Sequence, residues 1–280
     1  GKSMNVRIVT DSACDLRGDE VDKLNIEVVP LSIRFGDDEY TDREELDVSE
    51  FYRLLAESDA LPETAAPSPG RFAQAFQRHL DAGATAIVCI NLSSAISATM
   101  QSAITAAGEF EADIRIVDSK SITAGQGSIV LGAARLAATG ASADEVVATA
   151  ESMSERTHVF GALDTLENLQ KGGRIGNAQA LLGSMLSIKP IIDISSGAVE
   201  EAGKQRTRKK SLTWLRDKLG DFDAIENLAI MHGEAPDVEQ FVALLSEVTE
   251  VSNARIEKIG PVVGTHGGPR VLGYAFQVPE

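Results

Sequence analysis

The segment of residues 259–276 combines a threonine and a histidine with several glycines, a combination suited to holding an anion. Thr265 and His266 follow an apolar run and precede a Gly-Gly-Pro turn. Glycines let backbone amides approach a ligand closely, and an imidazole can donate a hydrogen bond to an anion near neutral pH. The alternative interpretation is a tight turn between two strands, with the histidine on the surface.

Further hydroxyl groups occur at two places in the first half of the chain. Thr64 lies in a proline-rich segment that is expected to be a loop, whereas Ser93, Ser94 and Ser97 follow an apolar run and precede an expected helix. Each hydroxyl can donate one hydrogen bond, and the free amides at a helix start favour an anion. The alternatives are a turn role for Thr64 and helix capping for Ser94.

Asp11, Asp15 and Asp118 could suggest a metal site, but we interpret them as caps of strand ends. Cys14 and Cys89 have neither CxxC nor Cys/His metal spacing. Cys89 lies in an apolar run, which indicates a buried thiol, and two cysteines indicate a reducing compartment. The sequence also lacks a Walker loop and a GxGxxG motif. We therefore expect no metal and no nucleotide bound by this chain itself.

The net charge of −16 limits the possible partners. A field of this sign repels nucleic acid and anionic membrane surfaces, so neither is expected as a partner. No apolar run reaches the ~18 residues of a membrane span, and no stable membrane insertion is expected. We expect a cytoplasmic protein. Positive charge gathers at Lys171-Gly-Gly-Arg174 and in residues 204–210, where an anionic partner could dock.

Apolar runs alternate with helical patterns through the first half of the chain. Strands are expected at residues 5–9, 27–35, 84–90 and 113–117. Helices are expected at residues 47–58, 70–82 and 124–138, the second of them capped by Ser68. This alternation predicts an α/β fold whose N-terminal sheet is open, mostly parallel and covered by helices on both faces. Ligands in such sheets bind beyond the carboxyl ends of the strands.

The pattern changes after residue 140. Strands are expected at residues 158–163, 189–193, 227–232 and 255–259, and helices at 143–156, 211–219 and 238–248. The Gly-rich segment after residue 259 is expected to be a loop. We predict a second α/β (α+β) domain, with an N-terminal domain of residues 4–155 and a C-terminal domain of residues 156–280.

Several segments, taken together in this order, resemble the DegV family. They are residues 10–16, 63–72, 90–103 and 166–175, followed by 188–192 and 265–267. The resemblance extends from Val6 to Phe276. It implies a DegV-like fold and a fatty-acid-binding protein without an active site of its own, the acyl-carrier subunit of a bacterial fatty acid kinase.

The resemblance further implies a long-chain fatty acid, such as palmitate or oleate, with its carboxylate buried between the two domains and its acyl chain in a tunnel. A separate ATP-binding kinase subunit phosphorylates the bound carboxylate, and the acyl phosphate enters phospholipid synthesis. No cofactor is implied.

The head group is implied to contact Thr64, Ser94 and His266, with Ser93, Ser97 and Thr265 as further candidates. Ala65 stands where the family usually has Ser, which removes one possible donor. Ala98 stands where it usually has Gly, which adds a methyl group where the backbone approaches the ligand.

Two further sets of residues are assigned by hypothesis. The apolar segment 177–188 is a candidate wall for the acyl chain, and the alternative is ordinary helix packing. Its candidate lining residues are Leu181, Leu182, Met185 and Ile188. Lys171, Arg174 and Arg206 are candidates for docking the kinase subunit, and the alternative is a solvated surface.

Two other functions remain open at this point. One is a hydrolase or acyltransferase acting alone, with Ser94 as nucleophile and His266 as base, although no GxSxG motif is present. The other is a lipid-sensing interaction module, which would bind lipid without transferring it.

Overall fold

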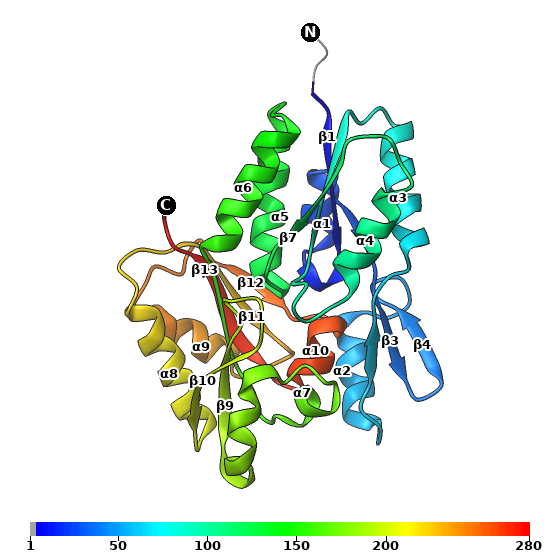
Figure 1. Ribbon diagram of the computed structural model, residues 1–280. Helices are drawn as coiled ribbons and strands as arrows, with labels where there is room; N and C mark the ends of the chain where they lie inside the picture. Colours follow the sequence, from blue (N-terminus) through cyan, green and yellow to red (C-terminus); the bar gives the residue numbers. More distant parts are fainter. Residues whose placement is uncertain (1–3) are drawn as a thin grey trace.

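The computed structural model describes residues 4–280, apart from the side chains of residues 184–187. In the described chain, two large sheets lie side by side, and a third sheet of three strands contains β3 (Ser32–Phe35) and β4 (Asp38–Thr41) (Figure 1). The strands of the first sheet all precede residue 119, and those of the second sheet begin at Thr157. The structure confirms the mixed α/β fold.

The first sheet is fully parallel and has the strand order β2-β1-β6-β7. Its strands are β1 (Val6–Asp11), β2 (Glu27–Val29), β6 (Ala86–Asn91) and β7 (Ile114–Asp118). The helices that cover it are α3 (Pro69–Asp81) and α4 (Thr99–Ala107) on one face, and α5 (Thr123–Ala138) and α6 (Ala143–Glu155) on the other. This arrangement is the predicted one.

Burial on both faces explains the continuous apolar run of β6. Ile87 and Cys89 pack into the cluster that contains the aromatic residues of α3. Val88 and Ile90 point to the opposite face and pack against α5. Successive side chains of a strand alternate between the two faces, so a strand covered on both sides must be apolar at every position.

The strand expected at residues 27–35 is divided in two, which corrects the prediction. β2 ends at Val29, and β3 (Ser32–Phe35) belongs to a different, antiparallel sheet with β4 (Asp38–Thr41) and β5 (Glu63–Ala65). Pro30 lies at the break. Proline has no N–H to donate to a sheet ladder, so it interrupts the pairing of the strand. β5 falls in the segment expected to be a loop, and it places Thr64 opposite Ile33.

The second sheet has the strand order β10-β9-β8-β13-β11-β12, and only β11 and β12 pair in parallel. Its strands are β8 (Thr157–Ala162), β9 (Lys189–Asp193), β10 (Glu200–Gln205), β11 (Glu226–His232), β12 (Arg255–Lys258) and β13 (Leu272–Gln277). Helices α8 (Arg208–Gly220) and α9 (Val238–Leu245) cover its outer face (Figure 1). The second α/β (α+β) unit is therefore observed.

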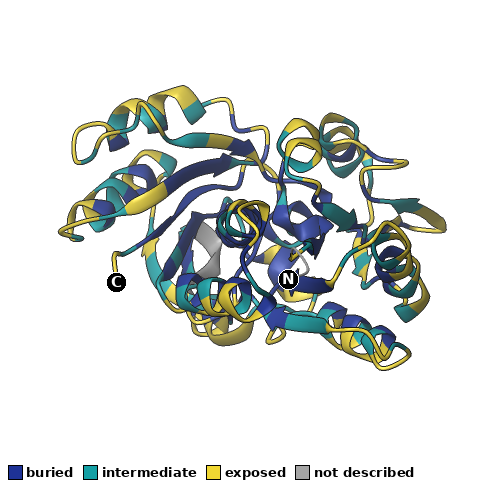
Figure 2. Cartoon of the chain, turned by 90° about the horizontal axis from the view of Figure 1, so that it is seen from above, coloured by how far each residue is buried: buried dark blue, intermediate teal, exposed yellow. Residues whose placement is uncertain are grey.

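The inner face of this second sheet turns toward the first sheet. In β8, Phe160 and Ala162 pack beneath α8 and α9, whereas Val159 belongs to the hydrophobic cluster between the sheets. Seen from above, buried segments concentrate in the strands and between the two halves of the molecule, and exposed residues lie on the outer helices and loops (Figure 2).

Further helices lie in the connections between strands of the same sheet. They are η1 (Ser12–Cys14), α1 (Gly18–Lys23), α2 (Val48–Glu57), α7 (Glu167–Lys171), η2 (Gly176–Ser187) and α10 (Pro261–Gly267). The Gly-rich segment expected to be a loop is thus a helix, α10. Pro261 fits its first position, and Gly268, with a φ of 81°, ends it. Within residues 4–280, no helix has both the length and the apolarity needed to cross a membrane.

Asp11 organises the carboxyl ends of the first sheet. Its buried carboxylate accepts hydrogen bonds from the backbone amides of Ala13 at 3.1 Å and Leu92 at 2.9 Å. It also accepts from the side chains of Asn91 and Gln126, each at 3.1 Å. Burial raises the pKa of Asp11, and these four donors oppose that shift. These contacts agree with the predicted role of Asp11 as a cap of a strand end.

Asp11→Ala should lower the free energy of unfolding by about 2–4 kcal/mol, because it leaves several buried donors without an acceptor. Urea denaturation measures this change. Asp22→Ala, at an exposed position of α1, is the control and should change the value by less than about 0.5 kcal/mol. Equal effects of the two substitutions would contradict the role of Asp11.

Candidate functional site

An apolar cavity lies between the two large sheets, beyond the carboxyl ends of β1 and β6. Thr64, Ser97, Thr123, Arg174 and His266 are its polar lining residues. Aliphatic side chains and Met231 form most of the remaining wall. They are Leu31, Leu92, Ile96, Ile122, Val159, Leu163, Leu169, Ile192, Ile194, Val199, Met231, Ile259, Val262, Val263 and Val271.

Thr64 and His266 meet at this cavity although 202 positions separate them in the sequence. The Oγ1 of Thr64, on β5, lies 2.9 Å from Nε2 of His266, on α10. The other ring nitrogen, Nδ1, is buried and has no hydrogen-bond partner among the described residues. Gly172 makes room for the ring, because a Cβ at that position would lie 2.5 Å from Nδ1.

The His266 imidazole is neutral near neutral pH. Burial, and then the positive charge of Arg174, lower its pKa from 6.5 to about 4. A neutral imidazole carries one N–H donor and one acceptor nitrogen. His266 can therefore still donate one hydrogen bond to an anion, as the sequence suggested, but it brings no charge of its own.

Arg174 supplies positive charge at the cavity wall. Its Nε donates to the carbonyl oxygen of Ile96 at 3.2 Å, and Nη1 donates to that of Gly172 at 2.8 Å. The guanidinium thus joins the segment after α7 to the loop that precedes α4. The sequence hypothesis placed Arg174 on a docking surface, whereas the structure places it, partly buried, on the cavity.

The predicted serine residues lie in different places. Ser97 lines the cavity, and its hydroxyl lies 2.8 Å from Oγ1 of Thr99. Ser93 donates to the carbonyl oxygen of Gly197 at 2.6 Å. Of these two serines, only Ser97 lines the cavity.

Ser94 and Thr265 are not on the cavity surface. Ser94 is exposed and donates to the carboxylate of Asp118. It does not cap a helix either, because α4 begins only at Thr99. Thr265 donates within α10 to the carbonyl oxygen of Pro261 at 2.8 Å. A nucleophile–base pair of Ser94 with His266 is therefore not formed.

The candidate acyl-chain residues lie near the cavity. Leu181, Leu182 and Ile188 are not among its lining residues; they pack in the hydrophobic cluster that also contains its wall. The reason is that η2 packs on the β9–β10 hairpin, with the amide of Asn177 donating to the carbonyl oxygen of Val199. Val199 occupies the wall instead. The side chain of Met185 lies outside the described residues.

Sequence reasoning missed Thr123, which lines the cavity at the start of α5. Its φ of 47° is in the left-handed region, where a β-branched residue is an outlier. Such strain concentrates at functional sites. No sequence pattern reveals it, because the strain arises from contacts between segments far apart in the chain.

The cavity is small relative to a lipid. Its volume is about 80 Å³, whereas pockets that enclose drug-sized ligands have volumes of about 300–1,000 Å³. Its walls are aliphatic side chains rather than backbone, and such side chains can change rotamer. A long ligand therefore requires the walls to move apart.

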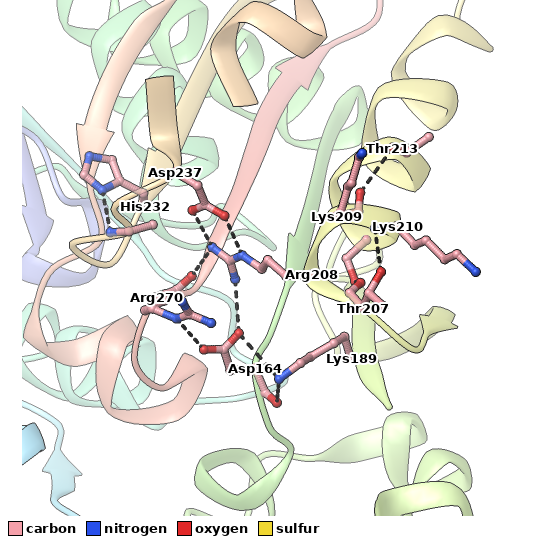
Figure 3. A network of polar contacts seen from close by, with 12 residues as sticks. Asp164, Lys189, Thr207, Arg208, Lys209, Lys210, Thr213, His232, Asp237 and Arg270 are labelled. Atoms are coloured by element: carbon pink, nitrogen blue, oxygen red, sulfur yellow. Dashed lines mark hydrogen bonds and ion pairs between the residues drawn. The ribbon is translucent and has the colours of Figure 1, made fainter. Parts of the chain in front are cut away.

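The basic segment of residues 204–210 is only partly available to a partner. Arg208 is engaged in a network in which its guanidinium contacts Asp237 at 2.9 Å and Asp164 at 3.3 Å (Figure 3). Asp164 also pairs with Arg270 at 2.7 Å. Lys210 points away from this network (Figure 3).

Two residues of the docking hypothesis are exposed. Arg206 is exposed at the end of β10. Lys171 is exposed at the end of α7 and pairs with Glu167 at 3.3 Å. Their exposure is compatible with docking and with a solvated surface.

The fold and the site define an α/β protein with an apolar cavity between two sheets and a threonine–histidine pair in the cavity wall. The chain belongs to the DegV family, because the family profile, described as "Uncharacterised protein, DegV family", matches residues 5–278. A DegV domain-containing protein of Streptomyces coelicolor is 34% identical over 275 residues, which cover 97% of this chain and 98% of the relative.

Solved structures show the same fold. A fatty acid binding DegV family protein from Thermus thermophilus has a TM-score of 0.91 and 32% identity, covering 99% of this chain and all of the other. DegV from Bacillus subtilis, described as a fatty acid binding protein, has a TM-score of 0.86 and 28% identity, with 99% and 100% coverage.

The lowered pKa of His266 predicts a pH-dependent contribution to stability. In the unfolded chain a histidine titrates near 6.5, and in the folded protein His266 titrates at about 4. Between these values the unfolded state binds more protons, so this residue lowers the free energy of unfolding as the pH falls. With allowance for its partial exposure, the total loss should be about 1–2 kcal/mol.

Urea unfolding of the wild type and of His266→Gln at pH 4–7.5 measures this contribution. Glutamine keeps a polar group near Thr64 but does not titrate. The wild type should lose more stability than the variant between pH 6.5 and pH 4. Parallel curves for the two proteins would show that His266 does not titrate differently on folding.

Proposed function

We propose that this chain binds a long-chain fatty acid in the cavity between its two sheets, with the carboxylate at Thr64 and His266. One observation carries the proposal: the wall of an aliphatic cavity contains a pair of partly buried, hydrogen-bonded side chains, Thr64 and His266. The fatty acid binding described for the Thermus thermophilus and Bacillus subtilis proteins supports it.

The head group would be bound mainly by hydrogen bonds. A fatty acid carboxylate has a pKa similar to that of a glutamate side chain, so it is ionised near pH 7. It can accept from the hydroxyl of Thr64 and from the N–H of His266 once their mutual hydrogen bond opens. Arg174 adds a favourable charge from the cavity wall. Ser97, which lines the cavity, is a candidate for an additional donor.

The acyl chain would supply most of the affinity. Burying about sixteen methylene groups at ~0.8 kcal/mol each gives roughly 13 kcal/mol before the costs of ordering the ligand and widening the cavity. The aliphatic walls from both sheets offer no polar group that would be left unpaired by this contact. Micromolar or tighter binding is then attainable without a buried ion pair.

We further propose that the chain is a non-catalytic carrier in the cytoplasm, from which a separate ATP-binding kinase subunit phosphorylates the carboxylate. The acyl phosphate would then feed phospholipid synthesis. Lys171, exposed at the end of α7, and Arg174, on the cavity wall close to it in the sequence, support a docking face beside the cavity, and Arg206 is a further exposed cation. Because Ser94 contacts Asp118 and not His266, the hydrolase alternative has no support in the site geometry.

Removing either head-group donor should weaken the binding of oleate. Thr64→Val and His266→Gln should each reduce affinity by about 1–3 kcal/mol, because a buried anion loses a hydrogen bond. Methyl oleate, which lacks the charge, should be affected less by both substitutions. Isothermal titration calorimetry with both ligands measures these differences.

Thr105→Val is the matched control, since Thr105 is exposed on α4. It should bind both ligands like the wild type. The head-group assignment would be wrong if acid and ester lost the same affinity in the Thr64 and His266 variants.

Acyl phosphate should form only when the kinase subunit, ATP and oleate are all present. Arg206→Ala should slow this transfer while leaving oleate affinity intact, because Arg206 is exposed. Arg174→Ala should reduce both, because Arg174 lines the cavity. Transfer should fall as salt rises, since exposed charges are screened. Radiolabelled ATP and thin-layer chromatography of the product provide the measurement.

Arg115→Ala is the control for charge removal at a site on β7, in the first sheet. Product formed without the kinase subunit would show that this chain is itself an enzyme. Oleate binding without transfer in the presence of the subunit would favour the lipid-sensing alternative.

A further inference from the structure

A carboxylate that the proposed function does not use lies in the wall between the cavity and an outer groove. Asp15 lines this groove, which has a volume of about 520 Å³. On the opposite side, Asp15 contacts Thr123, which lines the lipid cavity. The hydrogen bond between Asp15 and Thr123 therefore forms part of the wall that separates the two spaces.

The Asp15 carboxylate contacts both halves of the molecule. Its Oδ2 accepts a hydrogen bond from Oγ1 of Thr123, in α5, at 2.7 Å. The backbone N–H of Gly260, which precedes α10, faces the same carboxylate. A Cβ at Gly260 would lie only 2.5 Å from Oδ1 of Asp15. The close approach explains why glycine occupies this position.

Two of these residues have unusual backbone conformations. Asp15 has a φ of 53° and Thr123 a φ of 47°. Aspartate tolerates the left-handed region, but a β-branched threonine rarely adopts it. Such a conformation persists only where the surroundings hold it. The hydrogen bond from Thr123 to Asp15 is a contact that can do so.

Helix α10 connects this contact to the head-group pair. It is fixed near its start by the Tyr52 hydroxyl, which donates to the carbonyl oxygen of Ile259 at 2.8 Å. His266 lies near its other end. Because a short helix moves as a rigid unit, a shift at Gly260 would displace the imidazole relative to Thr64.

We propose that Asp15 is a positioning residue for the lipid head group, holding Thr123 and the start of α10 together so that His266 is aligned with Thr64. The effect on lipid rests on the proposed function. The effect on the His266 ring does not, and it can be measured without lipid.

The charge of Asp15 makes this positioning sensitive to pH. Burial raises the pKa of Asp15 to about 7; Asp42 adds to the shift, while Thr123, Gly260 and Arg43 oppose it. Burial also raises the pKa of Asp42 to about 6 and that of Glu257, which lines the same groove, to about 7, so both titrate in this range. Cys14 and Tyr52 have raised pKa values and stay neutral. An ionised carboxylate accepts from both Thr123 and Gly260, whereas the protonated acid has lost part of this capacity.

Stability and alignment should respond to pH in opposite directions. The folded-state pKa of Asp15 is above its unfolded value, so the stability it contributes is present at low pH and is lost as the pH rises to about 7. Ionisation near pH 7 instead completes the contacts that align α10. If Asp15 had a purely structural role, stability and the alignment of α10 would not respond to pH in opposite directions.

The test compares wild type, Asp15→Asn and Asp22→Asn, the last being the same change at an exposed position. The ring signals of His266, one of four histidines, are identified in NMR spectra from their loss in His266→Gln. In Asp15→Asn these signals should shift and lose a pH-dependent step near pH 7 that the wild type and Asp22→Asn retain. At pH 8, the variant should bind oleate three- to tenfold more weakly, and at pH 6 the difference should disappear.

Thr123 tests the same hydrogen bond from its other side. Thr123→Val removes the donor and should shift the His266 signals, and Thr123→Ser keeps the hydroxyl and should restore them. The proposal would be overturned if Asp15→Asn and Thr123→Val both kept the His266 signals and the pH profile of the wild type. If the signals shift as expected but the wild type binds no oleate, the proposed function fails and the positioning role stands.

Discussion

The proposed site depends on one constraint: a carboxylate must be held in an aliphatic cavity mainly by hydrogen-bonding groups that are themselves neutral. Thr64 and His266 meet this requirement, because they satisfy each other in a hydrogen bond of 2.9 Å and burial keeps the imidazole uncharged. A lysine in this place would need an acidic partner and would carry its own desolvation cost. In the proposed function, the neutral pair would bind the carboxylate by hydrogen bonds and leave it available as an acceptor of a phosphoryl group.

The rest of the structure is arranged around this pair. The small antiparallel sheet exists because Pro30 ends β2, and it brings Thr64 to the cavity. Helix α10 brings His266 from the opposite side, with its start against Asp15. Arg174 connects the segments on either side of the cavity through the carbonyl oxygen of Ile96. Ligand entry must therefore disturb contacts between the two halves, which couples occupancy to their spacing.

Features that depend on local sequence pattern could be predicted, whereas features that depend on contacts between distant segments could not. The alternation of apolar runs and helices predicted the parallel sheet, and Ser68 was recognised as the cap of α3. The helix α10 was missed because glycine is a poor helix former. Gly264 is required there by packing, since a Cβ would lie 2.7 Å from the rings of α2. The placements of Arg174 and Thr123 on the cavity follow from contacts with segments 78 and 108 positions away, which no local pattern encodes.

The central claim is that a fatty acid is bound with its ionised carboxylate at Thr64 and His266. The most direct measurement is the NMR signal of oleate labelled with ¹³C at its carboxyl carbon, added to the protein at pH 7. We expect a single bound signal at the chemical shift of an ionised carboxylate, which moves in Thr64→Val and in His266→Gln. A spectrum containing only free oleate, or a bound signal that neither substitution moves, would contradict the claim.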